Sequence, residues 1–309
     1  MALVLPSQMA KNRWQDRVKS RVVNRYGSFN VLRKGISYSL WRYDPYHALL
    51  TISWGTFVAL VTVGYFIINA IFALLYLAGG DGIENARSGN FFDAFFFSVQ
   101  TMASIGYGAM YPKTAYANLL VTIESIIGLL ILTMASGIMF ARFSLPKARV
   151  IFSRIVLITT YNGLPTLMLR IANKRENWIL EAQVRLTIVR NEYTKEGSFM
   201  RRFYDVPLVR SDSPLFALSW SVMHTIDENS PLYGMTQHKM IEDEMEILVI
   251  FTGIDETVSQ TIHARHSYVP DEIVWGAQFV DILTRTRDGK RCIDYAKFHD
   301  FVSTVNIKP

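Results

Sequence analysis

The segment NFFDAFFFSVQTMASIGYGAMYP, residues 90–112, joins a short aromatic half to a glycine-rich half, and this combination is the most informative feature of the chain. The first half, residues 91–103, has helical character but is too short for a bilayer, which takes about 20 residues as a helix. The run SIGYG, residues 104–108, is predicted to be non-helical. Such backbone is tolerated at membrane depth only where it lines a cavity or packs against protein. The stretch therefore predicts a re-entrant loop that lines a pore.

Long apolar runs flank this loop on both sides. Residues 48–80 contain no charged side chain, and residues 114–141 contain only Glu124. Each run is longer than the roughly 20 residues that span a bilayer as a helix. We therefore expect two membrane crossings, with the re-entrant loop between them.

The distribution of basic residues predicts the topology. Residues 1–42 carry nine Lys or Arg against one acid, and more basic residues follow the second apolar run. The segment between the crossings is weakly acidic. Because basic flanks stay on the cytoplasmic side, both termini are expected in the cytoplasm and the chain in the plasma (inner) membrane. The start of the chain does not have the pattern of a cleaved signal peptide.

Composition excludes several classes of protein. The chain has 309 residues, of which 50% are hydrophobic and 19% charged, which is too apolar for a disordered chain. The single cysteine, Cys292, excludes a disulfide framework and a multi-cysteine metal site. The chain has no nucleotide-binding glycine loop, HExxH motif or nucleophile elbow, so no enzyme activity and no organic cofactor are predicted. The net charge of +6 is assigned to membrane lipid and not to nucleic acid.

The segment YSLWRYDPYHALLTISW, residues 38–54, is rich in aromatic residues at spacings suited to headgroup depth. Its Asp44–Pro45 pair is typical of a capped helix start. We interpret the segment as an in-plane helix that leads into the membrane. The alternative is that it forms the first turns of a longer transmembrane helix.

Residues 146–309 have a different character, with apolar and polar residues alternating from Leu180 to Ile188. This period of two predicts a half-buried strand. Further strand-like runs, separated by turn signals such as Asn162–Gly163, are residues 166–172, 199–204, 219–224, 247–252 and 278–283. The predicted domains are a basic cytoplasmic segment (1–37), the interfacial helix (38–54), a pore domain (55–145) and a cytoplasmic β-sandwich (146–309).

The glycine-rich run has the chemistry of an ion filter. Backbone carbonyls can replace the hydration shell of a cation only if alternate residues adopt dihedrals that glycine accepts easily. Gly106 and Gly108 supply that freedom, and Ser104 adds a hydroxyl at the inner end. Ile105 and Tyr107 are expected to point outward and brace the loop against surrounding helices. One copy per chain requires four chains around the pore.

The sequence TMASIGYG, residues 101–108, after FFFSVQ, resembles the filter of potassium channels. Four cytoplasmic segments, IDENSPLYG (226–234), EILVIFTGIDET (246–257), ARHSYVPDEIVWG (264–276) and DYAKF (294–298), closely resemble prokaryotic, KirBac-type inward-rectifier potassium channels. The resemblance implies a homotetramer with potassium ions held at Ser104, Ile105, Gly106 and Tyr107. It also implies an in-plane slide helix, an immunoglobulin-like cytoplasmic assembly that extends the pore, and control by phosphoinositides and other anionic lipids.

The chain departs from the family pattern at three positions near the filter. Ser104 stands where the usual residue is threonine, and Gln100 stands where many members have a glutamate. Ala109 follows the filter where other potassium channels often carry aspartate.

The second crossing carries the candidate gate. Gly128 and Gly137 are candidate hinges by the family pattern, with close helix packing through small residues as the alternative. Leu132 matches the cavity position where strong rectifiers carry an acid, so magnesium or polyamines are expected to block only weakly. Phe140 is the candidate gate, with a lipid-facing aromatic as the alternative. Glu124 is either a structural acid satisfied by partners or a pore-lining charge.

Basic groups just beyond the second crossing, Arg142, Lys147 and Arg149, form the candidate lipid-headgroup site, or only a positive-inside anchor. Asp255 and Glu256 match the family region that lines the cytoplasmic pore, or form an ordinary solvated turn.

His263 and His266 are weak candidates for metal binding or proton sensing, with a solvated sheet edge as the stronger interpretation.

Together with the residues, the resemblance implies a homotetrameric, voltage-independent, weakly rectifying potassium channel gated by anionic lipids. The alternatives are a poorly selective cation channel and a membrane-anchored β-sandwich binding module.

Overall fold

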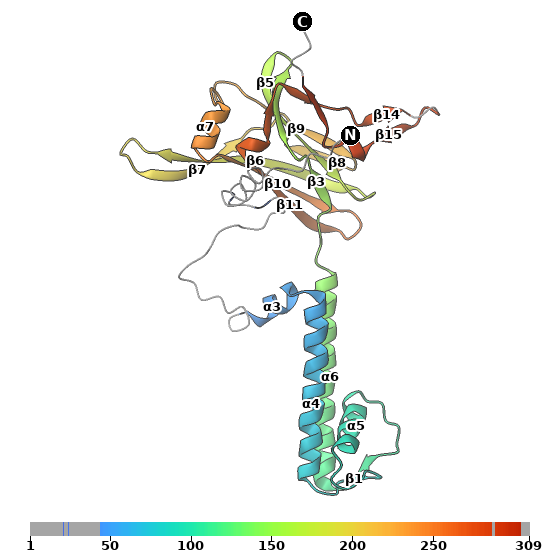
Figure 1. The fold of residues 1–309 in the computed structure, drawn as a ribbon. Coiled ribbons are helices and arrows are strands. Elements are labelled where there is room, and N and C mark those ends of the chain that lie inside the picture. Colours follow the sequence, from blue (N-terminus) through green and yellow to red (C-terminus); the bar gives the residue numbers. More distant parts are fainter. Residues whose placement is uncertain (1–20, 22–23, 25–43, 286–287, 304–309) are drawn as a thin grey trace, which may run out of the picture. The chain divides into compact units, whose positions relative to one another are not determined.

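The computed structural model describes residues 21, 24, 44–285 and 288–303, and Figure 1 traces its elements. The chain divides into a helical unit, residues 35–145, and a second unit that holds residues 1–34 and 146–309. Nearly all of the predicted basic segment 1–37, and the first part of the predicted interfacial helix, lie outside the described residues.

The helical unit holds the two predicted crossings and the predicted half-helix. Its helices are α3 (Pro45–Thr51), α4 (Trp54–Ala78), α5 (Phe91–Met102) and α6 (Ala115–Phe143). Helices α4 and α6, of 25 and 29 residues, are long and apolar enough to cross a membrane. They run side by side, with α5 packed against both (Figure 1).

Helix α3 is separate from α4. Asp44 caps its start by accepting a hydrogen bond from the amide of His47 at 2.9 Å, and Pro45 occupies the first turn. The helix ends at Thr51, and the backbone of the following residue, Ile52, is extended at ψ 160°. Ser53 then caps α4 by accepting a hydrogen bond from the Thr56 amide at 3.1 Å. Between Asp44 and Ala78 the chain therefore forms two helices, and not the single long helix that was the alternative.

A short two-stranded ribbon lies between the crossings. Strands β1 (Ile83–Glu84) and β2 (Tyr111–Pro112) pair antiparallel, with Ile83 opposite Pro112 and Glu84 opposite Tyr111. The ribbon ties the segment before α5 to the segment after the glycine-rich run, so α5 and that run form one closed loop.

The second unit is a sandwich of two five-stranded sheets. One has the order β11-β10-β6-β7 with β8 on β6, and the other has the order β12-β4-β5-β3 with β9 on β5. The strands of the first sheet are β6 (Ile179–Tyr193), β7 (Phe199–Val206), β8 (Asp212–Phe216), β10 (Glu246–Asp255) and β11 (Gln260–Tyr268). The second contains β3 (Val150–Phe152), β4 (Val156–Tyr161), β5 (Leu164–Asn173), β9 (Ser219–Thr225) and β12 (Ile273–Trp275).

Smaller elements complete this unit. They are helix α7 (Gln237–Glu242), the pair β13 (Ala277–Phe279) with β16 (Phe301–Ser303), and the pair β14 (Leu283–Arg285) with β15 (Arg291–Ile293). Two single 3₁₀ turns, η1 (Pro270–Glu272) and η2 (Tyr295–Lys297), lie beside them.

The alternation in residues 180–188 is confirmed as a strand that buries every second side chain. Ala182, Val184, Leu186 and Ile188 of β6 are each at most 2% exposed and form the core between the sheets. The predicted turn at Asn162–Gly163 joins β4 to β5, with both residues at positive φ, as the type I′ turn of a two-residue hairpin requires.

The prediction of one strand over residues 278–283 is wrong. The run is divided between β13 and β14, because the residues between them bond to other segments. The Val280 amide donates to the Asp300 carbonyl, and the Ile282 carbonyl accepts from the Asp294 amide. These partners are distant in sequence, so local alternation does not reveal them.

One buried histidine in the sandwich connects strand β9 to two neighbouring segments of the chain. His224 of β9 is 1% exposed, with its Nδ1 2.6 Å from the Pro207 carbonyl and its Nε2 2.7 Å from the Ser230 hydroxyl. Because a carbonyl only accepts, Nδ1 carries the proton and the Ser230 hydroxyl donates to Nε2. Burial lowers the pKa of His224 below its ordinary value of 6.5. The neutral ring therefore fits this site.

We expect the sandwich to lose stability in acid through His224. In the pH range just below the ordinary histidine pKa, the unfolded chain binds a proton that the folded chain does not, so the free energy of unfolding falls as the pH falls. Thermal unfolding of the purified protein between about pH 8 and about pH 5.5 measures this dependence. His224→Gln is expected to flatten it, whereas His238→Gln, at an exposed histidine of α7, is expected to leave it unchanged. Equal slopes in all three proteins would contradict the assignment.

Candidate functional site

The glycine-rich run begins where α5 ends. Ala103 caps the helix, the Ser104 amide donates to the Thr101 carbonyl at 3.1 Å, and the Ile105 amide donates to the Gln100 carbonyl at 2.9 Å. Helix α5 itself ends at Met102, so the run is non-helical from its first residue. The negative end of the α5 dipole therefore adjoins the inner end of the run.

Every second residue of the run has a positive φ angle. Ser104, Gly106 and Gly108 have φ of 54°, 65° and 78°. The sequence predicted this freedom at the two glycines, and the structure adds Ser104, which pattern alone does not identify because serine rarely adopts positive φ. Alternation of this kind lets successive carbonyls share one side of an extended strand.

The described residues of the same chain only partly cover the side chains of Ile105 and Tyr107. Ile105 is 44% exposed and Tyr107 is 73% exposed. The bracing expected for these residues is therefore not supplied by the helices of the same chain.

A buried polar network joins α5 to the two crossings and shows which of the two roles considered for Glu124 is correct. This acid is fully buried; Tyr76 donates to its Oε2 at 2.6 Å, and Ser98 bonds its Oε1. Ser98 also lies 2.9 Å from Asn69 Oδ1. The network joins α4, α5 and α6. Glu124 is thus a structural acid satisfied by partners, and the alternative of a pore-lining charge is wrong in this chain.

Sequence analysis missed the partners Tyr76, Asn69 and Ser98. The available signal was that Asn69 is an amide within the first apolar crossing and Ser98 a hydroxyl within the aromatic part of the half-helix. Polar groups in such positions need partners, and an acid on the facing helix is one.

Gly128 is a point of close packing. A Cβ atom built there would lie 2.7 Å from the Met102 carbonyl oxygen and 2.8 Å from Met102 Cγ, so α6 approaches the end of α5 through this glycine. The geometry favours the packing alternative over a hinge. Gly137 differs, because a Cβ there would meet nothing within 4 Å in the chain.

Leu132 and Phe140 lie on α6 with their side chains largely uncovered. Leu132 is 65% exposed and Phe140 is 74% exposed. The two positions are two i, i+4 steps apart, so they share one broad face of the helix. This placement leaves both available to a pore or to lipid.

The structure corrects the assignment of Arg142 to lipid. Its side chain is only 9% exposed; its guanidinium donates to the Leu49 carbonyl and, at 2.7 Å, to the Ile52 carbonyl. It also lies over the rings of Trp54 and Phe57, at 4.7 and 4.9 Å. Arg142 therefore satisfies carbonyls at the end of α3 and holds the α3–α4 corner to α6. Lys147 and Arg149 are exposed.

The structure also separates Asp255 from Glu256. Asp255 is 1% exposed and accepts hydrogen bonds from Arg175 at 2.6 Å and Asn177 at 2.7 Å. Its charge is neutralised inside the sandwich, so its assignment to the cytoplasmic pore is wrong. Glu256, the next residue, is exposed.

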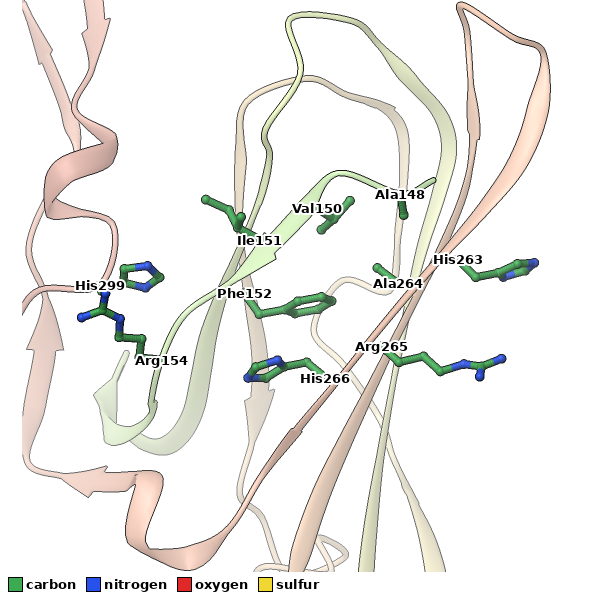
Figure 2. Close-up of a pocket in the computed structure, with 10 residues that line it drawn as sticks. All are labelled: Ala148, Val150, Ile151, Phe152, Arg154, His263, Ala264, Arg265, His266 and His299. Carbon is green, nitrogen blue, oxygen red and sulfur yellow. The ribbon is translucent and has the colours of Figure 1, made fainter. Parts of the chain in front are cut away.

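The predicted histidines border a cavity of about 650 Å³ in the second unit (Figure 2). His266 lies inside it, stacked on Phe152 at 5.1 Å, whereas His263 points away along the opposite face of β11. His299 lies beside Arg154 at one side of the cavity, and burial and that arginine lower the pKa of His299. No group of three metal-ligating side chains occurs among the described residues, so the geometry offers no metal site there.

Comparison with known proteins assigns both units. The family described as the inward rectifier potassium channel C-terminal domain matches residues 150–308, and the ion-channel family matches residues 56–144. Inward rectifier potassium channel Kirbac3.1 of Paramagnetospirillum magnetotacticum is 51% identical over 91% of this chain and 96% of its own length.

Mammalian relatives are more distant. G protein-activated inward rectifier potassium channel 2 of Mus musculus is 31% identical over 97% of this chain and 76% of its own length. G protein-activated inward rectifier potassium channel 1 of Bos taurus is 31% identical over 91% of this chain, which spans only 61% of that protein. The relatives are ion channels and not enzymes, and like them this chain is a membrane protein with two crossings and a cytoplasmic β-domain, whose permeant ion is potassium. The chain belongs to the family of inward-rectifier potassium channels.

Proposed function

We propose that four copies of the chain surround one pore and that potassium ions cross the membrane through Ser104–Gly108. The observation that carries this proposal is the alternation of positive φ at Ser104, Gly106 and Gly108, directly after the half-helix α5. A ring of such strands supplies backbone carbonyls in place of the hydration shell of the ion. The negative end of α5 adds favourable potential at the inner end.

The exposed side chains of the run support the tetramer. Ile105 and Tyr107 are too exposed in one chain to hold an extended strand in place, and a neighbouring copy supplies the missing contacts. Backbone that is neither helical nor paired is tolerated at membrane depth only inside such protein surroundings.

On this proposal α6 lines the cavity and closes the pore. Four Phe140 rings exclude water at the cytoplasmic end, and Gly137, which has space around it, is the hinge. Gly128 is a packing contact. Leu132 leaves the cavity without an acid, so internal magnesium or polyamines block weakly and the channel rectifies weakly.

Anionic lipids act on Lys147 and Arg149, because both basic groups are exposed and follow the end of α6 by only a few residues. Arg142 takes no part in headgroup binding but transmits motion between α3 and α6. Glu256 is the remaining acid of its pair available to attract cations in the cytoplasmic pore.

Rubidium uptake into liposomes, with potassium inside and sodium outside, tests the permeation pathway. We expect barium-sensitive rubidium flux that sodium does not replace. Gly106→Ala is expected to abolish it, because a Cβ at φ 65° strains the strand in every copy. Gly64→Ala, in α4 with no atom within 4 Å of the new Cβ, is the matched control and should conduct. Equal sodium and rubidium flux in the wild type would contradict a potassium-selective filter.

Phe140→Ala should increase rubidium flux several-fold, because the smaller side chain no longer excludes water at the closure. Met134→Ala removes another largely exposed apolar side chain of α6, six positions earlier and about 120° around the helix, and should leave flux unchanged. An unchanged flux in Phe140→Ala would place this ring against lipid instead.

Lys147→Gln combined with Arg149→Gln is expected to blunt the response of flux to anionic lipid in the liposomes, because the negative headgroup loses both of its basic partners on the protein. Lys195→Gln, at an exposed position in the β6–β7 turn, controls for the loss of charge. A full lipid response in the double variant would reduce the two residues to topology anchors.

A further inference from the structure

One side-chain hydrogen bond from the described part of the chain reaches the backbone just beyond the outer end of the glycine-rich run. Asn85 Nδ2 donates a hydrogen bond to the Ala109 carbonyl at 2.8 Å, immediately after Gly108. At the inner end the backbone is held by the hydrogen bond of the Ile105 amide to α5. Among the hydrogen bonds of the described residues, none from the same chain reaches the backbone of residues 106–108. The Asn85 bond is therefore the first fixed point beyond Gly108.

Asn85 is itself held in place. It directly follows β1, whose two residues are paired in register with β2. The Lys113 amide donates to the Gly82 carbonyl at 2.9 Å, and the Lys113 ammonium pairs with Asp81 at 2.8 Å and Glu84 at 3.3 Å. The donor therefore projects from a braced ribbon.

The ribbon is also seated against α6. A Cβ added to Gly82 would lie 3.2 Å from Thr114 Oγ1 and 3.3 Å from Ala117 Cβ, so the ribbon backbone closely approaches the start of the helix. A shift of the Ala109 carbonyl relative to α6 would therefore have to break the Asn85 bond or move the ribbon.

The backbone conformation restricts which residue can serve at this position. Asn85 has φ of 62°, a region that glycine, asparagine and aspartate enter most readily. Of these three, only asparagine carries a side-chain donor for a carbonyl at neutral pH. Asparagine thus meets both the dihedral and the hydrogen-bond requirement.

We infer that Asn85 is a positioning residue for conduction, which fixes the outer end of the selectivity filter through the Ala109 carbonyl. The inference rests on the proposed filter at Ser104–Gly108. A filter that selects by the number and placement of its carbonyls depends on backbone that does not drift. Without the bond, the backbone beyond Gly108 loses the one side-chain hydrogen bond that the described residues give it, and the preference for potassium over sodium weakens.

The test measures the ratio of rubidium to sodium flux in liposomes for the wild type and four variants. Asn85→Asp keeps the shape and the tolerance of positive φ but loses the donor. Asn85→Gly keeps the backbone freedom and loses the side chain. Ser88→Asp and Ser88→Ala, three residues further along the same exposed loop, control for the added charge and for the truncation.

We expect both Asn85 variants to lower the flux ratio about fivefold, the order of effect of losing one hydrogen bond. Both Ser88 variants should keep the wild-type ratio. All variants should remain tetrameric in detergent and keep the wild-type response to anionic lipid, which a general loss of structure would not leave intact.

Wild-type selectivity in Asn85→Asp and Asn85→Gly would overturn the inference while leaving the proposed filter in place. A wild-type protein that conducts sodium and rubidium equally would instead defeat the proposed function. An equal loss in the Ser88 variants would overturn the inference too, because it would assign the effect to the loop and not to the Asn85 donor.

Discussion

The structure depends on one constraint, which is that five residues of non-helical backbone, Ser104–Gly108, lie between two apolar crossings with few partners in their own chain. Unpaired carbonyls cannot face lipid. On the proposed function, permeant ions and neighbouring copies of the chain satisfy this backbone. The rest of the helical unit then acts as its support: α5 leads into the run, α4 and α6 pack against α5, and the β1–β2 ribbon closes the loop.

The supports differ in chemistry at the two ends of the run. Near the inner end, the acid Glu124 joins three helices through Tyr76 and Ser98 in a fully buried network. Near the outer end, one exposed amide, Asn85, reaches the Ala109 carbonyl. A third polar contact lies at the other end of α6, where Arg142 bonds carbonyls of the α3–α4 corner. In each case a polar group in an apolar helix or a short loop fixes one segment of the helical unit against another.

The sequence predicted the features that depend on local pattern and missed those that depend on distant contacts. Apolar length revealed both crossings, and alternation revealed β6 with its buried Val184 and Leu186. Charge and position beyond the crossing assigned Arg142 to lipid, and resemblance to the family assigned Asp255 to the cytoplasmic pore. Both side chains are instead buried against partners tens of residues away. The role of Asn85 could not be predicted, because its hydrogen bond joins residues 24 positions apart and a single asparagine in a loop does not indicate a positive φ.

The most direct test of the central claim is to locate the permeant ion. Anomalous diffraction from crystals of the intact protein grown in rubidium would show the ions by their own scattering. The account predicts a fourfold assembly with rubidium on its axis, level with the carbonyls of Ser104, Ile105, Gly106 and Tyr107. Rubidium absent from that axis in an intact tetramer, or held by side chains elsewhere, would contradict it.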